Sequence, residues 1–524
     1  MIKINLLDHK GDMSNSRRTI IYPTGSKHRS FYWILTCILI VMNSCQERAP
    51  SPNVLFISVD DWNDWVGCLG DSVVQTPNLD RLSKMGMLFT NAHCAAPVCN
   101  PSRASLMTGL LPSTTGVYNN AQPIFATHPD LVSIPRHFKN NEYIVEGGGK
   151  TYHEQIGFNN PGDWDYYFLW DEGNRENGWW GQYGKPPAPQ PVIRPEHSIA
   201  DLTVLNFDWS ELDVPDHWMP DFKVASWARY FLSRKHDRPF FLATGIFKPH
   251  IPWYVPKEYF DLYNIDDIEL PPYNPDDLED IPEAGREIAL DHRSKHDKVM
   301  EMGLWKDAIR AYYASISHSD RQVGRILEGL EKSDYLENTI IVLWSDHGYH
   351  LGEKDHWHKL TLWERATRVP LIIIAPGITT PGSVCNKSVS LIDLYPTLIE
   401  LCNLPSKPEL DGHSLVPLLS DPEAEWEYPA ITTRDKNNHA IRTEQFRYIR
   451  YQDGTEELYD HATDPNEWTN LADEEQYREI KSDLSKWLPA ENAEDALHKT
   501  RDLIFNKEEY KWYPKQIVHE IKTN

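Results

Sequence analysis

The sequence predicts an α/β fold in which helices flank a layered sheet, followed by a smaller α+β subdomain. Two observations support this expectation. Short apolar runs, typical of strands buried on both faces, alternate with helical segments over most of the 524 residues. After about residue 410, short stretches that resemble antiparallel strands are followed by a helix. We therefore expect a larger domain over 45–410 and a smaller one over 411–524.

Four buried strands and two helices are predicted for the larger domain. The strands, each apolar along its length, are expected at 53–59, 239–244, 339–344 and 369–375. One helix should begin at Thr76-Pro77, because Thr is a good N-cap residue and Pro suits the first helical position. A second helix is expected from Ala308 to about Leu330. Residues 159–220 show little periodicity and many Trp, Pro, Gly and Asn residues, which predicts a long loop insertion.

The smaller domain is predicted to combine a short antiparallel sheet with one helix. Its strands are expected at 440–443, 446–451 and 457–459. The helix should run from about residue 473 to 488, with one apolar face made by Tyr477, Ile480, Leu484 and Trp487.

Residues 1–44 have the pattern of a lipoprotein-type secretory signal. Basic residues precede an apolar run over 31–42 that is too short for an ordinary membrane span. Cys45 directly follows Ser44, as in a bacterial lipobox, so cleavage before Cys45 and lipidation of its thiol would anchor the protein. We expect an exported protein, in the periplasm or on the outer membrane or cell surface, that meets the membrane only through this lipid. Plain secretion is the alternative.

Charge and cysteine content restrict the possible functions. The chain has 52 Lys and Arg against 77 Asp and Glu, a net charge of −25, which argues against binding nucleic acid. The 19 Trp residues fit either core packing or stacking on sugars. Apart from Cys37 and Cys45, which belong to the signal, the chain has five cysteines, namely Cys68, Cys94, Cys99, Cys385 and Cys402. An odd number leaves at least one cysteine unpaired within the chain. A Cys385–Cys402 disulfide and a Cys68–Cys94 disulfide are both possible.

Acidic residues follow two of the predicted strands. Asp60 and Asp61 come directly after the 53–59 strand, and Asp346-His347 follows the 339–344 strand. Ligands of open α/β sheets bind beyond the carboxyl ends of strands, and neighbouring buried carboxylates are costly without a cation or several hydrogen bonds. Three carboxylates suit Ca²⁺ or Mg²⁺, whereas the histidine would also allow Zn²⁺ or Mn²⁺. An Asp pair at a strand end can also be a turn or a helix cap.

A third signal surrounds Cys99. The segment Cys99-Asn-Pro-Ser-Arg103 reads as the beginning of a helix, with Pro101 at the first or second helical position, and Leu106-Met-Thr-Gly109 follows. The positive end of the helix and Arg103 would favour an anion nearby. An ordinary buried or reactive cysteine is the alternative interpretation.

This segment resembles the signature of the formylglycine-dependent sulfatases of the alkaline-phosphatase superfamily, Cys-x-Pro-Ser-Arg followed by Leu/Met-Thr-Gly. Further elements of that family occur in the same order, at Asp60-Asp61, Lys150-x-x-His153, Lys248-Pro-His250-Ile-Pro252, Asp346-His347, Lys359 and Asp464-Pro465…Asn470-Leu471. The resemblance runs from about residue 52 to about 475 and is closest to the iduronate-2-sulfatase-like branch. It implies a catalytic domain with an alkaline-phosphatase-like mixed central sheet, and the smaller C-terminal subdomain.

The resemblance also implies the nucleophile and the metal. A maturation enzyme would oxidise Cys99 to formylglycine (3-oxoalanine), and one hydroxyl of the hydrated aldehyde would attack sulfur. A Ca²⁺ ion, with Mg²⁺ as the alternative, would be held by Asp60, Asp61, Cys99, Asp346 and His347.

The remaining motif residues have implied roles in binding and proton transfer. Lys150 and Lys359 would bind the sulfate oxygens, and Arg103 would orient the hydrate. His250 would contact the substrate and protonate the departing alcohol. His153 would deprotonate the second hydroxyl, whose loss of a proton expels sulfate and restores the aldehyde.

The predicted activity is hydrolysis of sulfate esters in a sulfated poly- or oligosaccharide, such as ulvan or glycosaminoglycan fragments. The acidic surface should slow the approach of long polyanions, which favours exo-acting cleavage of small substrates. Sugar specificity is expected to lie in 159–220, in 253–300 and in the C-terminal subdomain. Two alternatives are a phosphate or phosphonate monoester hydrolase of the same superfamily, and a glycan-binding lipoprotein without activity.

Overall fold

The computed structural model describes residues 51–153, 157–169, 207–291, 293–498, 503–506 and 511–515. Residues 51–524 form one compact unit. The predicted signal segment with Cys45, and residues 170–206 of the predicted insertion, lie outside the described residues. Within the described ranges, no helix is both long enough and apolar enough to cross a membrane.

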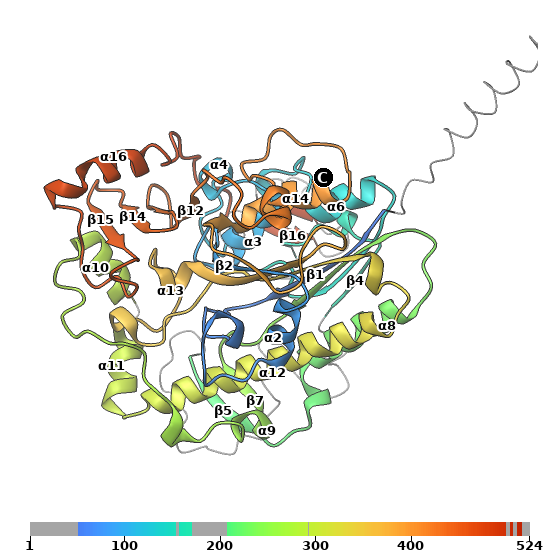
Figure 1. Cartoon of the computed structure of the whole chain (residues 1–524), viewed down its shortest axis with the longest axis horizontal. Helices are drawn as coiled ribbons and strands as arrows, with labels where there is room; N and C mark the ends of the chain where they lie inside the picture. The colour runs from blue at the N-terminus through green and yellow to red at the C-terminus, as the bar shows by residue number, and fades with distance from the viewer. Residues whose placement is uncertain are drawn as a thin grey trace, which may run out of the picture. The chain divides into compact units, whose positions relative to one another are not determined.

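A mixed sheet lies at the centre of this unit (Figure 1). Among the described residues its nine strands follow the order β10-β2-β9-β8-β1-β6-β3-β4, and β11 also pairs with β2. Strand β9 runs antiparallel to both of its neighbours, β2 and β8. In the same order the strands are Ser383–Cys385, Met87–His93, Arg368–Ile374, Thr339–Ser345, Asn53–Val59, Phe240–Ile246, Ile144–Gly149 and Tyr166–Phe168, with β11 at Val389–Ser390.

Helices cover both faces of the sheet. In β1, Leu55, Ile57 and Val59 pack into one buried cluster, whereas Val54 and Phe56 pack into another on the opposite face. The first cluster includes residues of α2 (Pro77–Ser83), α8 (Pro220–Ser233), α9 (Lys257–Phe260) and α12 (Trp305–Glu331). The second includes residues of α3 (Cys99–Thr108), α6 (Ile134–Asn140), α14 (Leu394–Leu401) and α15 (Val416–Ser420). Figure 1 shows α2, α8 and α12 on one side of the sheet and α3, α6 and α14 on the other.

The smaller subdomain contains a four-stranded antiparallel sheet. Its strands are β12 (Ala430–Thr433), β13 (His439–Arg442), β14 (Phe446–Arg450) and β15 (Glu456–Asp460). Helix α16 (Arg478–Ser485) covers one face, where Leu484 packs with Tyr448 and Leu458. On the other face, Ile449 and Tyr459 pack with residues of α10 (Glu283–Leu290). An element from the larger domain therefore supports this sheet.

The described structure has further α-helices and strands. They are α4 (Pro112–Thr115), α5 (Ile124–Thr127), α11 (Arg293–Glu301), α13 (Glu364–Thr367), the parallel pair β5 (Trp209–Leu212) and β7 (Trp253–Pro256), and the antiparallel pair β16 (Leu503–Asn506) and β17 (Lys511–Pro514).

The α/β fold and the small antiparallel sheet are confirmed. The four predicted strands of the larger domain are β1, β6, β8 and β9, and the predicted long helix is α12. The described part of the predicted insertion is not loop throughout, because β4 joins the central sheet and β5 pairs with β7. Trp164 and Trp253 are buried in the core, which favours the packing interpretation for these two tryptophans.

Two predictions about individual side chains were wrong. Thr76 stands at the N-cap position of α2 but its side chain does not cap the helix. Its hydroxyl instead accepts from the N–H of Gly67 and donates to Asp80. Trp487 was expected on the buried face of the last helix, but it lies beyond the end of α16 and is 37% exposed.

Neither of the possible disulfides forms. The five cysteines in the described part of the chain are all free, and Cys94, Cys99, Cys385 and Cys402 are buried. Burial raises the pKa of Cys402 to about 12 and that of Cys385 to about 11. These two thiols therefore behave as small apolar side chains at neutral pH.

A buried ion-pair network connects the smaller subdomain to α13. Arg447 of β14 is fully buried and pairs with Glu364 of α13 and, at 2.6 Å, with Glu467. It also donates to the carbonyl of Leu362 at 2.8 Å. The same carboxylates approach His461, at 3.9 Å for Glu364 and 3.1 Å for Glu467. Arg442 of β13 also pairs with Glu364, at 3.0 Å. Because two arginines already neutralise this acidic group, we interpret it as structural.

We expect Arg447→Met to lower the free energy of unfolding by about 3 kcal/mol, because it leaves buried Glu467 without its main partner and Glu364 without one of its two arginines. Urea denaturation measures the change. Arg450→Met, at the exposed end of the same strand, is the matched control and should change stability by less than about 0.5 kcal/mol. Equal effects of the two substitutions would contradict this role for Arg447.

Candidate active site

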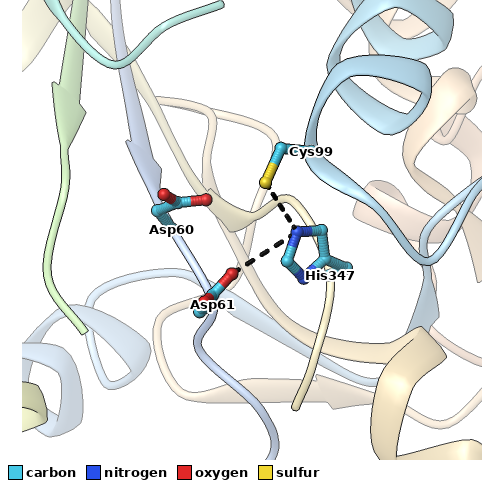
Figure 2. A group of neighbouring side chains, drawn as sticks. All are labelled: Asp60, Asp61, Cys99 and His347. Atoms are coloured by element: carbon cyan, nitrogen blue, oxygen red, sulfur yellow. Dashed lines mark hydrogen bonds and ion pairs between the residues drawn. The ribbon is translucent and has the colours of Figure 1, made fainter. Parts of the chain in front are cut away.

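Several strand ends and one helix start meet at the carboxyl edge of the central sheet. The residues that these elements bring there are Asp60 and Asp61 after β1, Asp346 and His347 after β8, Lys150 after β3, His250 after β6, and Cys99 at the start of α3. Figure 2 shows Cys99, Asp61 and His347 pointing toward one another, with Asp60 beside them. The sequence motifs are far apart along the chain, and parallel strands bring them to one place.

Cys99 is fully buried among positive charges. Its Sγ lies 3.1 Å from Nζ of Lys359, 3.3 Å from Nε2 of His347 and 3.8 Å from Nζ of Lys150. Burial alone would raise the pKa of this thiol, but the charges of Lys150, Lys359 and His347 and a hydrogen bond with His153 lower it well below its ordinary value. An anion is therefore the stable occupant of this position.

The helix start differs in one detail from the prediction. Cys99 is the first residue of α3 and Val98 is its N-cap, so Pro101 occupies the third helical position. The first four N–H groups of a helix have no partner within it, so proline costs no hydrogen bond there.

Both lysines are also paired with the carboxylates that follow β1. Lys150 pairs with Asp60, and Nζ of Lys359 lies 2.6 Å from Oδ1 of Asp61. Burial would raise the pKa of Asp60, but Lys150, with Arg103 and His250 in support, lowers it. Burial would lower the pKa of Lys359, but Asp61 and Cys99 raise it well above its ordinary value. Asp60 and Lys359 are therefore both ionised at neutral pH.

Arg103 holds two of the carboxylates. Its Nε lies 2.9 Å from Oδ2 of Asp346 and its Nη2 lies 3.3 Å from Oδ1 of Asp60, and all three side chains are fully buried. Another nitrogen of the guanidinium donates to the backbone carbonyl of Lys150. The structure thus places Arg103 where it fixes Asp60 and Asp346.

Four of the five predicted metal ligands form one compact group. Asp60, Asp61, Cys99 and His347 each offer a ligand atom within 4.8 Å of the others. Oδ2 of Asp61 is buried without a hydrogen-bond partner among the described residues, so it can still accept a cation. Asp346, the fifth, lies beside the group, with Oδ2 3.4 Å from Nε2 of His347.

The donor set fits a hard divalent cation with one imidazole ligand. Nδ1 of His347 is 3.0 Å from the carbonyl of Gly348, so it carries a proton and donates. Burial would lower the pKa of His347, but Asp346 raises it, which favours a second proton on Nε2 in the absence of a cation. A bound cation would take the place of that proton, as in a metal-bound histidine. With three carboxylates nearby, Ca²⁺ or Mg²⁺ suits the oxygen ligands.

A residue that sequence analysis missed supports this group from α12. Asp61 has a positive φ of 64°, a left-handed conformation that is uncommon for residues other than glycine. The hydroxyl of Tyr312 donates to the carbonyl of Asp61 at 2.7 Å and accepts from the N–H of Asn63 at 3.0 Å. Tyr312 lies in an apolar stretch of the predicted helix, so its spacing gave no sign of this contact.

The two predicted proton-transfer residues lie at less buried positions. His153 and His250 are both partly exposed, unlike the fully buried Asp60, Asp61 and His347. His153 hydrogen bonds the thiol of Cys99, and Nδ1 of His250 lies 2.7 Å from the carbonyl of Ile251. All ten predicted site residues other than Cys45 therefore lie within this one region.

Two family models match the chain. The model described as Sulfatase matches residues 52–404. The model described as N-sulphoglucosamine sulphohydrolase, C-terminal, matches residues 352–494. The first covers more than half of the chain and includes every motif around the Cys99 group.

Curated relatives match along most of their lengths. A protein named Sulfatase from Formosa agariphila is 39% identical over 479 residues, which cover 88% of this chain and 90% of the relative. Iduronate 2-sulfatase from Mus musculus is 31% identical, and the matched region covers 72% of this chain and 74% of the relative. A protein named Ulvan-active sulfatase from Formosa agariphila is 28% identical, covering 89% and 86%.

Solved structures share the fold. A protein solved in complex with its substrate D-glucosamine-2-N,6-O-disulfate has a TM-score of 0.66 at 22% identity, covering 84% of this chain and 97% of that one. A phosphonate monoester hydrolase of Agrobacterium radiobacter has a TM-score of 0.67 at 22% identity, covering 88% and 99%.

We expect Cys99, when unmodified, to be a thiolate at neutral pH, because the surrounding lysines stabilise the anion. With a chelator present, the ultraviolet absorption of the thiolate should persist in the unmodified wild-type protein at pH values well below the ordinary thiol pKa of about 8.5. The Cys99→Ser variant should lack this absorption. Cys94→Ser is the control, because burial raises the pKa of Cys94. Ionisation of Cys99 only at alkaline pH would contradict the electrostatic description of the site.

Proposed function

The chain belongs to the sulfatase family and is a sulfuric ester hydrolase, and on this premise we propose that it removes sulfate from sulfated oligosaccharides through a formylglycine formed at Cys99. The observation that carries the proposal is the position of Sγ of Cys99, 3.1 Å from Lys359 and 3.8 Å from Lys150 at a group able to hold a cation. Sγ stands where a hydroxyl of the hydrated aldehyde would lie, and two ammonium groups there suit the oxygens of a sulfate ester.

The proposed reaction has two steps at residue 99. In the first, one hydroxyl of the hydrate attacks sulfur, the bond from sulfur to the sugar oxygen breaks, and the sugar leaves as an alcohol. In the second, the remaining hydroxyl loses its proton, the C=O bond forms again and sulfate departs. A serine in this position would keep the sulfate ester, because it has no second hydroxyl to expel it. Water then adds to the aldehyde and restores the hydrate.

Lys150 and Lys359 would stabilise the charge on the sulfate oxygens. They are already fixed by Asp60 and Asp61, so little reorganisation is needed when negative charge builds up. Asp60, Asp61, Asp346 and His347 would hold a Ca²⁺ ion, or Mg²⁺, together with residue 99. When bound, the ion would supply Lewis-acid polarisation of the nucleophile and of a sulfate oxygen.

The two histidines would move the protons. His153, which hydrogen bonds residue 99, would take the proton of the second hydroxyl. His250 would give a proton to the sugar oxygen, whose own basicity makes it a poor leaving group without one. Its partial exposure agrees with contact to the sugar side of the substrate.

For the substrate we propose a short sulfated sugar chain, cleaved from its end. The likeness to relatives named iduronate 2-sulfatase and ulvan-active sulfatase supports a sugar that carries or adjoins a uronic acid. The net charge of −25 supports short substrates over long polyanions. We further propose that the lipobox-like Cys45 carries the lipid anchor of an exported protein, and that a maturation enzyme converts Cys99 before folding buries it.

Sulfate release is the direct test of this function. The enzyme should liberate inorganic sulfate from defined ulvan or glycosaminoglycan oligosaccharides, and Cys99→Ala should abolish the release. Mass spectrometry of the tryptic peptide reports whether Cys99 has become formylglycine. Cys68→Ser, a change at a partly exposed cysteine away from the site, should retain activity. A converted enzyme that cleaves phosphate or phosphonate esters but none of these sulfates would refute the proposal.

Metal binding has its own expected signature. Asp61→Asn should weaken Ca²⁺ binding by about tenfold or more, because it removes a charged ligand. Mutation of residues that only support the ligands of a metal site already lowers metal affinity by about this factor. Calorimetric titration and the rise in melting temperature on adding Ca²⁺ measure this without turnover. Asp64→Asn is the matched control, because Asp64 pairs with Arg365 and Arg368 instead. Equal Ca²⁺ affinity in both variants would contradict the assignment.

A further inference from the structure

The segment that carries His250 is held by two buried side chains, those of Asp221 and Lys248. The carboxylate of Asp221, in the first turn of α8, accepts from the N–H of Phe247 at 2.8 Å and from that of Lys248 at 3.0 Å. From the other direction, Nζ of Lys248 donates to the carbonyl of His250 at 3.3 Å and to the carbonyl of Pro252. The segment is therefore fixed through both its donors and its acceptors.

Lys248 is an unusual residue for such a position. Its side chain is 2% exposed, and among the described residues it forms no ion pair within 4 Å. Burial lowers its pKa to about 7, and the charge of Asp221 only partly offsets this effect. A buried ammonium is costly, whereas an apolar side chain of similar length would fill the same space. The hydrogen bonds that Lys248 gives to the segment are what an apolar residue could not supply.

These bonds bear directly on the orientation of the imidazole. Nδ1 of His250 lies 2.7 Å from the carbonyl of Ile251, and a carbonyl only accepts, so Nδ1 carries a proton. Proton exchange with a substrate then falls to Nε2. The two carbonyls that Lys248 binds belong to residues 250 and 252, on either side of the carbonyl that orients the ring. One ammonium group thus sets the direction of the peptide groups around it.

We propose that Lys248 is a positioning residue that aims Nε2 of His250 at the leaving oxygen of the substrate. The inference rests on the proposed role of His250 as the general acid. Loss of the Lys248 ammonium would let the carbonyls turn and the ring swing away, while the nucleophile at residue 99, Lys150 and Lys359 would keep their places.

The dependence of rate on the leaving group separates this role from a general structural one. An aryl sulfate releases a stable phenolate that needs no proton, whereas a sugar sulfate releases an alkoxide that does. The test compares kcat/KM on 4-nitrophenyl sulfate and on a sugar sulfate that the wild-type enzyme cleaves. The ratio of the two values in one preparation is independent of the fraction of protein that is folded or carries formylglycine.

We expect His250→Ala to lower kcat/KM on the sugar sulfate by about 100-fold or more, with a much smaller loss on the aryl sulfate. Lys248→Met should change the ratio in the same direction, by on the order of 10- to 100-fold, as misalignment of a catalytic group does. Lys248→Gln, whose amide keeps N–H donors, should lie between the wild type and Lys248→Met. Lys257→Met, an exposed lysine just after β7, should leave the ratio unchanged.

Two results would overturn the inference, and only one of them also contradicts part of the proposed function. If His250→Ala changes the ratio but Lys248→Met lowers both rates by the same factor, Lys248 has only a structural role and the proposed function stands. If neither variant changes the ratio, His250 is not the general acid, and that part of the proposed function fails together with the inference. The melting temperature of each variant is measured as well. If Lys248→Met melts far below the wild type, Lys248→Gln takes its place in the comparison of ratios.

Discussion

Buried charge at the carboxyl edge of the central sheet governs the structure of this protein. Asp60, Asp61 and Asp346 are removed from water, as are Lys150, Lys359 and Arg103. Transfer of such groups into the interior is costly unless each one meets a partner in good geometry. The ion pairs Lys150–Asp60, Lys359–Asp61 and Arg103–Asp346 satisfy this requirement around the thiol of Cys99. The same groups make residue 99 a place for an anion and leave Asp61 able to accept a cation.

The fold supplies the rigidity that these pairs need. Strand β1 lies between β8 and β6, so Asp60 and Asp61 are placed by the middle of the sheet. The turn after β1 is tied to β8 through the N–H of Trp62, which donates to Ser345 at 3.0 Å, and to α12 through Tyr312. Uncommon backbone geometry at Asp61 is thus maintained by neighbours on two other elements, as expected where function requires a strained conformation.

The smaller subdomain contributes to the site although it provides none of the predicted catalytic groups. Its first strand, β12, contacts the chain just before Cys99, where the hydroxyl of Thr432 donates to the carbonyl of Cys94 at 2.6 Å and the N–H of Thr433 to that of Ala95 at 2.9 Å. Arg434 donates to the carbonyl of Leu360, next to Lys359. The smaller subdomain therefore holds both the segment before Cys99 and the residue after Lys359, and it forms one compact unit with the larger domain.

The sequence alone was sufficient for the features that depend on neighbouring residues. Apolar runs predicted β1, β6, β8 and β9 and placed Asp60, Asp61, Asp346 and His347 after strands that end at a common edge. The resemblance to the sulfatases, not the spacing, added Cys99 to this site. The antiparallel direction of β9, the free state of Cys385 and Cys402, and the exposure of Trp487 were decided only by the tertiary structure.

The same limit explains what was missed in the site itself. Tyr312 contacts Asp61 across 251 residues, and Arg103 contacts Asp346 across 243. Lys248 was visible in its motif, yet its bonds to the carbonyls around His250 depend on how the chain turns after β6. Local pattern records which side chains are apolar and where elements begin. It carries no information on which distant backbone group a buried polar side chain will meet, because that choice is made only when the elements pack and every buried donor must find an acceptor.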